Sequence, residues 1–340
     1  MNASVESYTI EQHASLAARN TLRVDAHARQ LATLNDAGAL PELLDQLGES
    51  PLVLGAGSNV LFTDDYAGNV LLMATHGVDV DDDGDKAHIA VAAGEIWDDF
   101  VRWSLGQGFA GLENLILIPG TVGAAPIQNI GAYGVEVAEF IESVEAWDTR
   151  ERRVVTLDNA ACGFAYRDSL FKRERDRFIV TAIRFILPRM HPLKLDYAGL
   201  REEIARMGLT QPTPYLVAEA VRTLRTRKLP DPAVIGNVGS FFKNPLVPDA
   251  QAEALRCEHP GLPLWPAADG HTKLSAGWLI ESCGFKGLRE GDAGMSNRHA
   301  LVLVNHGHAS GAELWALAQH VIDGVATRFG IRLEPEPRII

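Results

Sequence analysis

The chain has 340 residues, of which 46% are hydrophobic and 22% are charged, the proportions of an ordinary soluble globular protein. Because one hydrophobic core rarely serves more than about 250–300 residues, this length predicts two or three domains. The formal net charge of −13 argues against nonspecific nucleic-acid binding, which needs a basic face, but a few local cations still suffice for an anionic small ligand.

The spacing of the cysteines and the lengths of the apolar runs predict the cellular compartment. Cys162, Cys257 and Cys283 are isolated and share no CxxC spacing, so neither a disulfide framework nor a metal site is expected. The first twenty residues lack the apolar stretch of a signal peptide, and no uncharged run is long enough to span a bilayer. We therefore expect a cytoplasmic protein without metal or membrane segment.

The first half of the chain reads as strand-rich and punctuated by glycine. One helical pattern, at 95–105, is stopped by Gly106 and Gly108, and the aspartate-rich stretch 79–85 reads as a solvated turn. The mixture of strands and helices predicts an α+β or α/β fold. The short apolar runs expected to be strands are 52–54, 70–73, 89–91, 144–147 and 179–187.

The first glycine-rich loop has the sequence LGAGSNVLF and begins at Leu54. It lies between two short apolar runs, and its backbone N–H groups can converge on a phosphate. No helical pattern follows it, so it is not the strand–loop–helix dinucleotide fingerprint. A plain hairpin turn is the alternative.

The second glycine-rich segment, at 111–134, has the sequence GLENLILIPGTVGAAPIQNIGAYG. Glycines and prolines lie among small and apolar residues with almost no charge, whereas a surface linker would be more polar. The segment is therefore expected to lie against something flat and large, and a pyrophosphate with an aromatic ring system fits that description.

A proline-containing stretch at 188–192 predicts a boundary, after which helices dominate. Thr213 and Pro214 form an N-cap and first turn, and the helix that follows carries Arg225 and Lys228 three residues apart on one face. For these two cations the alternative role is to complement the helix dipole.

The sequence GNVGSFFKNP, from Gly236, places one hydroxyl between a glycine pair and an aromatic pair. The glycines allow close approach of the backbone, and Phe241 and Phe242 can exclude water. Ser240 would then be a positioned O–H able to deliver a proton. The alternative is a glycine-rich turn in which Ser240 is a local cap.

The chain ends with a long helix and a predicted strand. Ser310 and Glu313 form a capping box, and Gly330 closes the helix. A strand at 331–333 is expected to follow. It would deliver three charged residues, Glu334, Glu336 and Arg338.

Six ordered motifs give the chain a resemblance to the UDP-N-acetylenolpyruvoylglucosamine reductases, the MurB family of flavoenzymes, over nearly its whole length. The resemblance implies an α+β protein with an FAD-binding domain of the p-cresol methylhydroxylase and vanillyl-alcohol oxidase type, made of two α/β subdomains, at 1–188. A C-terminal α+β substrate-binding domain would occupy 189–340, with 331–340 returning to the active site. The motifs are GAGSNVLF, GLENLILIPGTVGAAPIQNIGAYG, YRDSLFK, RKLPDP, GNVGSFFKNP and LEPEPR.

The resemblance implies that NADPH donates a hydride to non-covalent FAD, from which it reaches the enolpyruvyl double bond of UDP-N-acetylglucosamine enolpyruvate, giving UDP-N-acetylmuramate for peptidoglycan. Ser240 matches the family's proton donor, and Arg167 and Glu336 match the groups that assist it. An arginine can hold a carboxylate and a developing enolate bidentately. The alternatives are an ion pair of Arg167 with Asp168 and a surface position for Glu336.

The same resemblance places the remaining site residues, and we also expect a monomer with no nucleic-acid partner. Ala124 and Ala125 replace a serine pair of some relatives, which leaves backbone N–H groups to bind phosphate there. His299 replaces a glutamine of some relatives and is assigned no role. Substrate contacts are expected at Tyr197, whose loop closes over the phosphates in one family architecture, and at Lys228, Asn244 and Tyr133. Cofactor contacts are expected at Gly55, Gly57, Ser58, Asn59, Gly123, Ile127, Arg225 and Arg338.

Two other functions remain open from the residues alone. An FAD-dependent oxidase of a small alcohol or sugar would use the same FAD domain. Such enzymes often tether flavin through His or Cys, and neither glycine-rich motif contains either residue. A non-catalytic sugar-nucleotide-binding flavoprotein would not need the combination of Ser240, Glu336 and Arg167.

Overall fold

The computed structural model describes residues 6–197, 199–208 and 210–340. Within these ranges, no helix combines the length and apolar character that crossing a membrane requires. By its internal packing the chain divides into two compact units, each built from three separate stretches. The first unit comprises Met1–Ala14, Ala28–Ala56 and Ala67–Arg225, and the second comprises Ser15–His27, Gly57–Tyr66 and Thr226–Ile340.

The division into units differs from the boundary expected at residues 188 and 189. Residues 189–225 pack with the first unit, and short stretches from the N-terminal part of the chain belong to the second. A boundary between functional domains at 188 stays a prediction.

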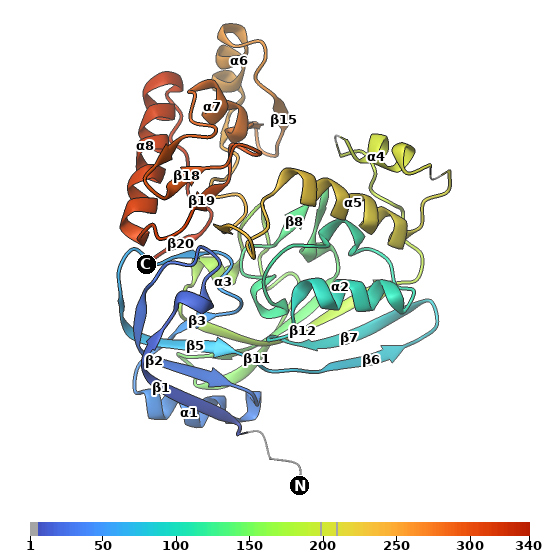
Figure 1. The fold of residues 1–340 in the computed structure, drawn as a ribbon. Helices are drawn as coiled ribbons and strands as arrows, with labels where there is room; N and C mark the ends of the chain where they lie inside the picture. The colour runs from blue at the N-terminus through green and yellow to red at the C-terminus, as the bar shows by residue number, and fades with distance from the viewer. Residues whose placement is uncertain (1–5, 198, 209) are drawn as a thin grey trace. The chain divides into compact units, whose positions relative to one another are not determined.

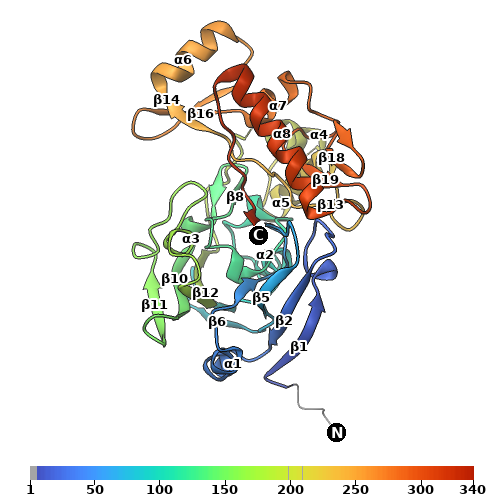
Figure 2. The ribbon, with the colours of Figure 1, turned by 90° about the vertical axis from the view of Figure 1, so that its left-hand side faces the viewer.

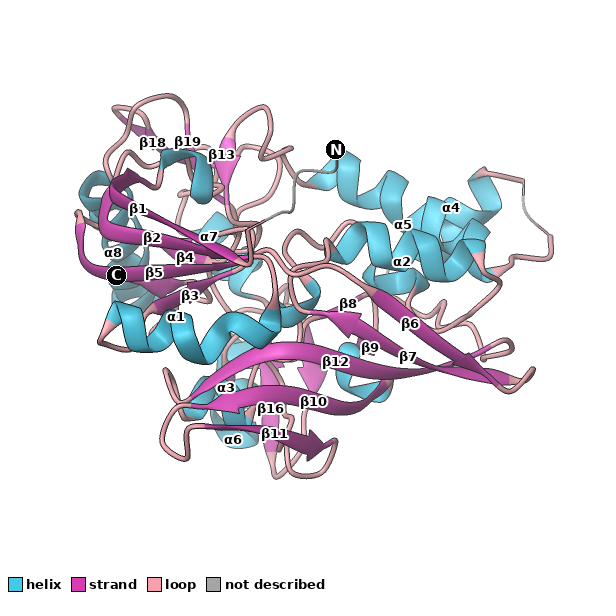
Figure 3. Ribbon diagram, turned by 90° about the horizontal axis from the view of Figure 1, so that it is seen from below, coloured by secondary structure: helices cyan, strands magenta, loops and turns pink. Residues whose placement is uncertain are grey.

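One sheet of the first unit has four strands in the order β1-β2-β5-β3 (Figure 1). The apolar run at 52–54 forms β3, which pairs with β5 in parallel and not with the strand that follows it, so the hairpin alternative is wrong. Helix α1 lies against this sheet, with its buried leucines in the same core (Figure 3). The elements are β1 (Tyr8–Ser15), β2 (His27–Leu34), α1 (Leu40–Leu47), β3 (Leu52–Leu54) and β5 (Tyr66–Met73).

The other large sheet of the first unit has five strands in the order β11-β10-β12-β7-β6, and each neighbouring pair is antiparallel (Figure 3). Its three central strands contain the apolar runs expected at 89–91, 144–147 and 179–187. Residues 79–82 of the aspartate-rich stretch pair with β7 as a strand, so the turn begins only after Asp82. The strands are β6 (Val78–Asp82), β7 (Lys86–Ala92), β10 (Ile141–Asp148), β11 (Arg153–Asp158) and β12 (Phe178–Pro188).

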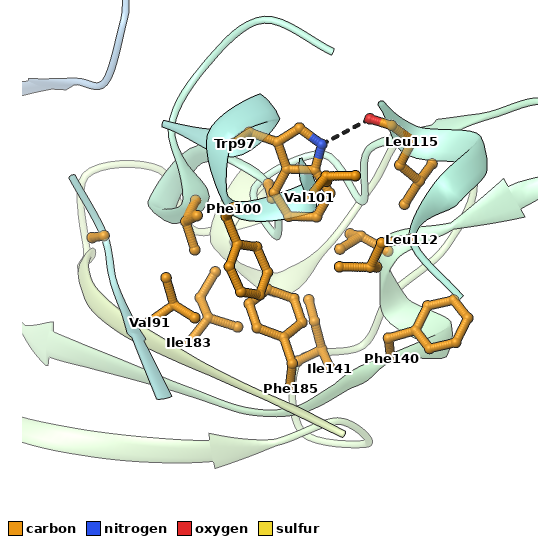
Figure 4. Packing of buried hydrophobic residues seen from close by; sticks show 14 of the residues in the cluster. Val91, Trp97, Phe100, Val101, Leu112, Leu115, Phe140, Ile141, Ile183 and Phe185 are labelled. Carbon is orange, nitrogen blue, oxygen red and sulfur yellow. Dashed lines mark hydrogen bonds between the residues drawn. The ribbon is translucent and has the colours of Figure 1, made fainter. Parts of the chain in front are cut away.

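Helix α2 (Trp97–Gly106) confirms the helical pattern predicted at 95–105. Its apolar face packs on β7 and β12, where the Phe100 and Phe185 rings lie 5.0 Å apart (Figure 4). Trp97 is fully buried, and its indole N–H donates to the Leu115 carbonyl at 2.9 Å. This bond ties the helix to the second glycine-rich segment.

The remaining elements of the first unit are short, except for α5, whose residues from Thr226 on belong to the second unit. Helix α5 begins at Pro214, and the Thr213 hydroxyl caps it by accepting from Leu216 N–H, as predicted. The elements are the 3-10 turns η2 (Ala37–Ala39), η3 (Glu113–Leu115), η4 (Val122–Ala124) and η5 (Val137–Glu139), the hairpin β8 (Gly131–Ala132) and β9 (Val135–Glu136), and the helices α3 (Leu170–Arg173), α4 (Leu200–Arg206) and α5 (Pro214–Lys228).

The second unit contains a four-stranded sheet in the order β13-β19-β18-β17 and a three-stranded sheet in the order β14-β16-β15. Helix α8 contacts β18 and β19, and α6 contacts β14 and β16 (Figure 2). The elements are η1 (Ala17–Arg19), β4 (Val60–Leu61), β13 (Gly236–Asn237), β14 (Leu246–Pro248), α6 (Asp249–Glu258), β15 (Leu264–Pro266), β16 (His271–Leu274), α7 (Ala276–Ser282), β17 (Arg289–Glu290), β18 (Ala293–Met295), β19 (Leu303–Asn305), α8 (Gly311–Phe329) and β20 (Arg338–Ile339).

The C-terminal prediction is right for the helix and wrong for the strand. Helix α8 has the capping box of Ser310 and Glu313 and ends at Gly330, whose φ is 66°. No strand forms at 331–333; the strand is β20, which pairs in parallel with β4. Arg338 follows Pro337, which has no N–H, and its own N–H donates to the Asn59 carbonyl.

Candidate functional site

The two glycine-rich segments meet within the first unit. A Cβ on Gly55 would lie 2.3 Å from the Thr121 Oγ1. The start of the first loop is therefore in direct contact with the second segment. A Cβ on Gly123 would lie 2.6 Å from that of Ala93, whose carbonyl accepts from Gly123 N–H at 2.8 Å. Both glycines are therefore needed for close contact of the chain with itself, and both remain partly exposed.

Most backbone donors of the second segment are already used. Gly123, Ala124, Ala125 and Ile127 all donate their N–H groups to carbonyls of the chain, the last at 3.3 Å to Ala124. The backbone N–H groups of Ala124 and Ala125, which were expected to bind phosphate, therefore already have partners within the chain, as do those of Gly123 and Ile127. As FAD contacts, Gly123 and Ile127 stay predictions, and they would act through close approach and apolar contact.

The rest of the first loop belongs to the second unit. Gly57 has φ of 61°, and a Cβ there would lie 1.9 Å from the Arg19 carbonyl oxygen. Asn59 accepts from Arg338 N–H at 3.0 Å, which brings together two residues 279 positions apart in the sequence that were both predicted to contact the cofactor. Ser58 directly precedes Asn59 in the sequence and is partly exposed.

This donor set fits FAD. Ser58, Asn59 and Arg338 of the second unit supply a hydroxyl, a carboxamide and a guanidinium, which are groups able to bind a pyrophosphate. The residues that the structure describes contain no cluster of three or more His, Cys, Asp or Glu placed to hold a metal ion.

Arg167 is tied to the hairpin of β8 and β9. Its Nη2 donates to the Gly131 carbonyl at 2.7 Å, and its own φ is 52°, an unusual value for a residue with a Cβ. Asp168, the alternative partner, pairs with Arg173. The guanidinium is therefore held against the hairpin by the fold.

Three further predicted residues lie together in the first unit. The rings of Tyr133 and Tyr197 lie 4.8 Å apart, and burial raises the pKa of Tyr133. Arg225 interacts electrostatically with both tyrosines and donates from Nη2 to the Leu117 carbonyl at 3.2 Å. Among the residues that the structure describes, none is a hydrogen-bond partner for its buried Nε, and burial is the main cause that lowers the pKa of Arg225.

Ser240 and Glu336 are brought together in the second unit. The carbonyl of Phe241, the residue after Ser240, accepts from Glu336 N–H at 2.8 Å, and Phe242 forms a bridge with Pro335. Phe241 and Phe242 are fully buried, whereas Ser240 and Glu336 are partly exposed. The structure thus pairs the backbone of Glu336 with that of the residue after Ser240.

Asn237 is a functional candidate that the sequence analysis missed. It is 1% exposed; its Nδ2 donates to the carbonyls of Pro230 and Ile235, and its Oδ1 accepts from Gly239 N–H at 2.9 Å. These bonds shape the turn that presents Ser240. An asparagine two residues before a glycine is a typical signal for such a turn.

Two predicted substrate residues have different surroundings in the second unit. Asn244 Oδ1 accepts from Ala276 N–H at 3.0 Å, so part of its hydrogen-bonding capacity serves the start of α7. Lys228 is exposed at the end of α5. Burial lowers the pKa of His299, and the charges of Lys228 and Lys286 lower it further.

Comparison with known proteins agrees with this arrangement. The model of the UDP-N-acetylenolpyruvoylglucosamine reductase C-terminal domain matches residues 231–340, and the model of an FAD binding domain matches residues 29–158. A solved structure of the reductase from Thermus caldophilus superposes with a TM-score of 0.67 at 27% identity, covering 98% of each chain.

Curated relatives match over nearly their full length. The UDP-N-acetylenolpyruvoylglucosamine reductase of Xanthomonas campestris pv. campestris strain B100 is 51% identical over 99% of this chain and 98% of its own. That of Xylella fastidiosa strain M12 is also 51% identical, over 98% of this chain and 96% of its own. The chain therefore belongs to the UDP-N-acetylenolpyruvoylglucosamine reductase family.

Proposed function

We propose that Ser240, Glu336 and Arg167 carry out, in this chain, the reaction of its family, the reduction of UDP-N-acetylglucosamine enolpyruvate to UDP-N-acetylmuramate in peptidoglycan precursor synthesis. When bound, FAD supplies the hydride, which it takes from NADPH. The observation that carries the proposal is the pairing of the Phe241 carbonyl with Glu336 N–H, because it joins the serine turn to the chain end.

Ser240 would protonate the carbon beside the substrate carboxylate. Hydride addition to one carbon of the double bond leaves an enolate that needs a proton on the other carbon. The pKa of an ordinary serine is far too high for easy proton donation, so neighbouring groups must lower the cost. Glu336 would do this by orienting Ser240, directly or through a water molecule.

Arg167 would bind the substrate carboxylate and stabilise the enolate. A guanidinium presents its donors in a rigid fork that matches a carboxylate. The bond to the Gly131 carbonyl fixes the direction of the side chain before substrate arrives, and such preorganisation is what transition-state stabilisation requires.

The reaction is tested by incubating the enzyme with NADPH and the UDP-sugar in deuterated water. Mass spectrometry should find a product with two added hydrogens, one from NADPH and one from solvent through Ser240. Nuclear magnetic resonance should locate the solvent deuterium on the carbon next to the carboxylate. Absence of solvent deuterium from that carbon would overturn the assigned roles of hydride and proton.

FAD should be held non-covalently, with one molecule per chain. We propose contacts at the converging loops of Gly55, Gly57, Ser58, Asn59, Gly123 and Ile127, with Arg225 and Arg338. Acid precipitation of the purified protein should leave all flavin absorbance in the supernatant, because no His or Cys in either glycine-rich segment can tether it. Flavin that stays with the pellet would favour the oxidase alternative.

Lys228 should bind the anionic phosphates of the substrate. Lys228→Ala is expected to weaken binding of the UDP-sugar by about 1.5–3 kcal/mol, the scale of a charge-assisted hydrogen bond. Flavin content should stay unchanged. Isothermal titration calorimetry measures the affinity, and absorbance of the released flavin measures the content.

Lys286→Ala is the matched control for Lys228. Lys286 is ion-paired with Glu281 at 2.9 Å, and its charge acts on His299 as that of Lys228 does. Removing it should leave substrate affinity close to wild type. If both variants weaken binding equally, the effect is the general charge of this region; loss of flavin in Lys228→Ala would place Lys228 at the cofactor.

The same proposal includes further substrate contacts, the cellular compartment and the oligomeric state. Tyr197 would close over the phosphates, with Tyr133 and Asn244 as further contacts. We also propose that the enzyme acts in the cytoplasm as a monomer, in keeping with its isolated cysteines. Cell fractionation and light scattering of the purified protein would check these two points.

A further inference from the structure

The tip of the β8–β9 hairpin has a conformation that its sequence disfavours. Ala132 pairs with Val135, so Tyr133 and Gly134 form a two-residue loop, and their φ angles are 50° and 83°. A loop with two positive φ angles favours Asn-Gly, and a bulky aromatic residue at its first position is strained. Surrounding contacts must therefore hold Tyr133 in place.

Asn114 provides such a contact from the 3-10 turn η3. Its side chain is fully buried, and its Nδ2 donates to the Tyr133 carbonyl at 2.7 Å. This hydrogen bond fixes the peptide that follows the strained residue. The same nitrogen donates to the Lys194 carbonyl at 2.9 Å, so one carboxamide joins two segments that are 61 residues apart in sequence.

The second segment carries the other tyrosine. Tyr197 follows Lys194 by three residues, and its ring packs at 4.8 Å from that of Tyr133. Tyr197 is half exposed, whereas Tyr133 is buried. The exposed ring therefore rests on a buried ring, and Asn114 holds the backbone of both segments.

In the described part of the chain, the Asn114 side chain acts only as a hydrogen-bond donor, through its Nδ2. Its Oδ1 is buried and, within the described part of the chain, has no hydrogen-bond partner. A buried unpaired acceptor is costly, so the residue is not explained as a general polar filler. Two donors on one planar nitrogen are what bridging two carbonyls requires, and neither aspartate nor leucine supplies them.

We propose that Asn114 is a positioning residue for substrate binding, which sets the Tyr133–Tyr197 pair by clamping the carbonyls of Tyr133 and Lys194. The inference rests on the proposed role of Tyr197 in binding the UDP-sugar. It assigns to Asn114 no contact with substrate or cofactor.

A double-mutant cycle tests this clamp on the FAD-loaded enzyme. Affinity for UDP-N-acetylglucosamine enolpyruvate is measured by calorimetry for Asn114→Ala, Tyr197→Ala and the double variant. Asn114→Ala alone should weaken binding about tenfold, as expected for two lost hydrogen bonds to a site. In the Tyr197→Ala background the same change should weaken binding less than about twofold, because the residue it acts through is gone.

Asn69→Ala is the matched control. Asn69 is also a buried asparagine of the first unit, and its Nδ2 donates to the Leu47 carbonyl at 3.1 Å, in the β1-β2-β5-β3 sheet. It should lower thermal stability without changing substrate affinity. Should Asn114→Ala not fold, Asn114→Ser keeps one donor, and its smaller loss of affinity should likewise vanish when Tyr197 is replaced.

The outcomes separate the clamp from the role of Tyr197. Unchanged affinity in Tyr197→Ala would contradict the proposed function of that tyrosine. Weakened binding in Tyr197→Ala, together with an Asn114 effect that is absent or equally large in both backgrounds, would overturn the clamp alone. An Asn69→Ala effect equal to that of Asn114→Ala would reduce the result to lost stability.

Discussion

Replacing Ser240 by alanine is expected to slow reoxidation of the NADPH-reduced enzyme by the UDP-sugar at least ~10²-fold, the lower end for loss of a positioned general acid. Reduction of the enzyme by NADPH should stay near the wild-type rate, because that half-reaction does not protonate the enolpyruvyl group. Stopped-flow absorbance separates the two half-reactions. Substrate affinity should change little, since alanine removes one oxygen atom from a partly exposed position.

Two further variants identify the proton path. Ser240→Cys should recover part of the lost rate, because a thiol is more acidic than a hydroxyl and reaches nearly the same point. Glu336→Gln should slow the same half-reaction, since Glu336 is proposed to orient Ser240 and its backbone pairs with Phe241, the residue after Ser240. It should leave reduction by NADPH unchanged.

The control for Ser240→Ala is Ser104→Ala. Ser104 is a buried serine whose hydroxyl donates to the Val101 carbonyl within α2 at 2.8 Å, so its loss tests destabilisation without chemistry. Both half-reactions should proceed normally in this variant. If Ser240→Ala slows reduction by NADPH and spares reduction of the sugar, Ser240 is a structural turn residue and another group gives the proton.

Gly55→Ala is expected to lower FAD content below about a tenth of the wild-type value and to lower stability by about 1–3 kcal/mol, the usual cost of overpacking. The new Cβ would lie 2.3 Å from Thr121 Oγ1, so the two glycine-rich segments must move apart. Flavin released per chain and thermal unfolding measure the two effects.

Thr121→Ala should rescue Gly55→Ala. It removes the Oγ1 and the Cγ2, which lies 3.3 Å from the position of the new Cβ, and so makes room for the added methyl group. FAD content of the double variant should approach that of Thr121→Ala alone, a coupling expected only for residues in contact. Gly106→Ala is the control, because nothing lies within 4 Å of its added Cβ, and it should bind FAD normally. Absence of rescue would show that the Gly55–Thr121 contact does not shape the cofactor site.

Local signals explain which parts of the fold could be predicted. Helix α5 begins where Thr213 and Pro214 placed it, and α8 has the capping box read from Ser310 and Glu313. A helix satisfies its backbone within four residues, so its ends are recorded in neighbouring positions. Short apolar runs likewise marked β3 and the central strands of the five-stranded sheet, because their burial alone requires such residues.

Pairing between distant segments explains what could not be predicted. The expected strand at 331–333 does not form. Instead β20, near the C-terminus, pairs with β4, which lies in the first fifth of the sequence. The clamp by Asn114 depends on the backbone carbonyls of Tyr133 and Lys194. Every residue has a backbone carbonyl, so the sequence does not show which ones accept a hydrogen bond from Asn114. Partners of this kind are chosen by where the chain packs, which local patterns do not record.

The sequence by itself determined the family, because its motifs have a specific order and composition, and the same motifs contain the residues proposed to carry the chemistry, Ser240, Arg167 and Glu336. It also determined the demand for glycine in both loops. Only the tertiary structure decided that Gly55 meets Thr121, that Glu336 bonds to the residue after Ser240, and that Asn114 holds two tyrosine segments. The physical reason is that such contacts join positions tens to hundreds of residues apart, and their free energy is realised only when the whole unit has folded.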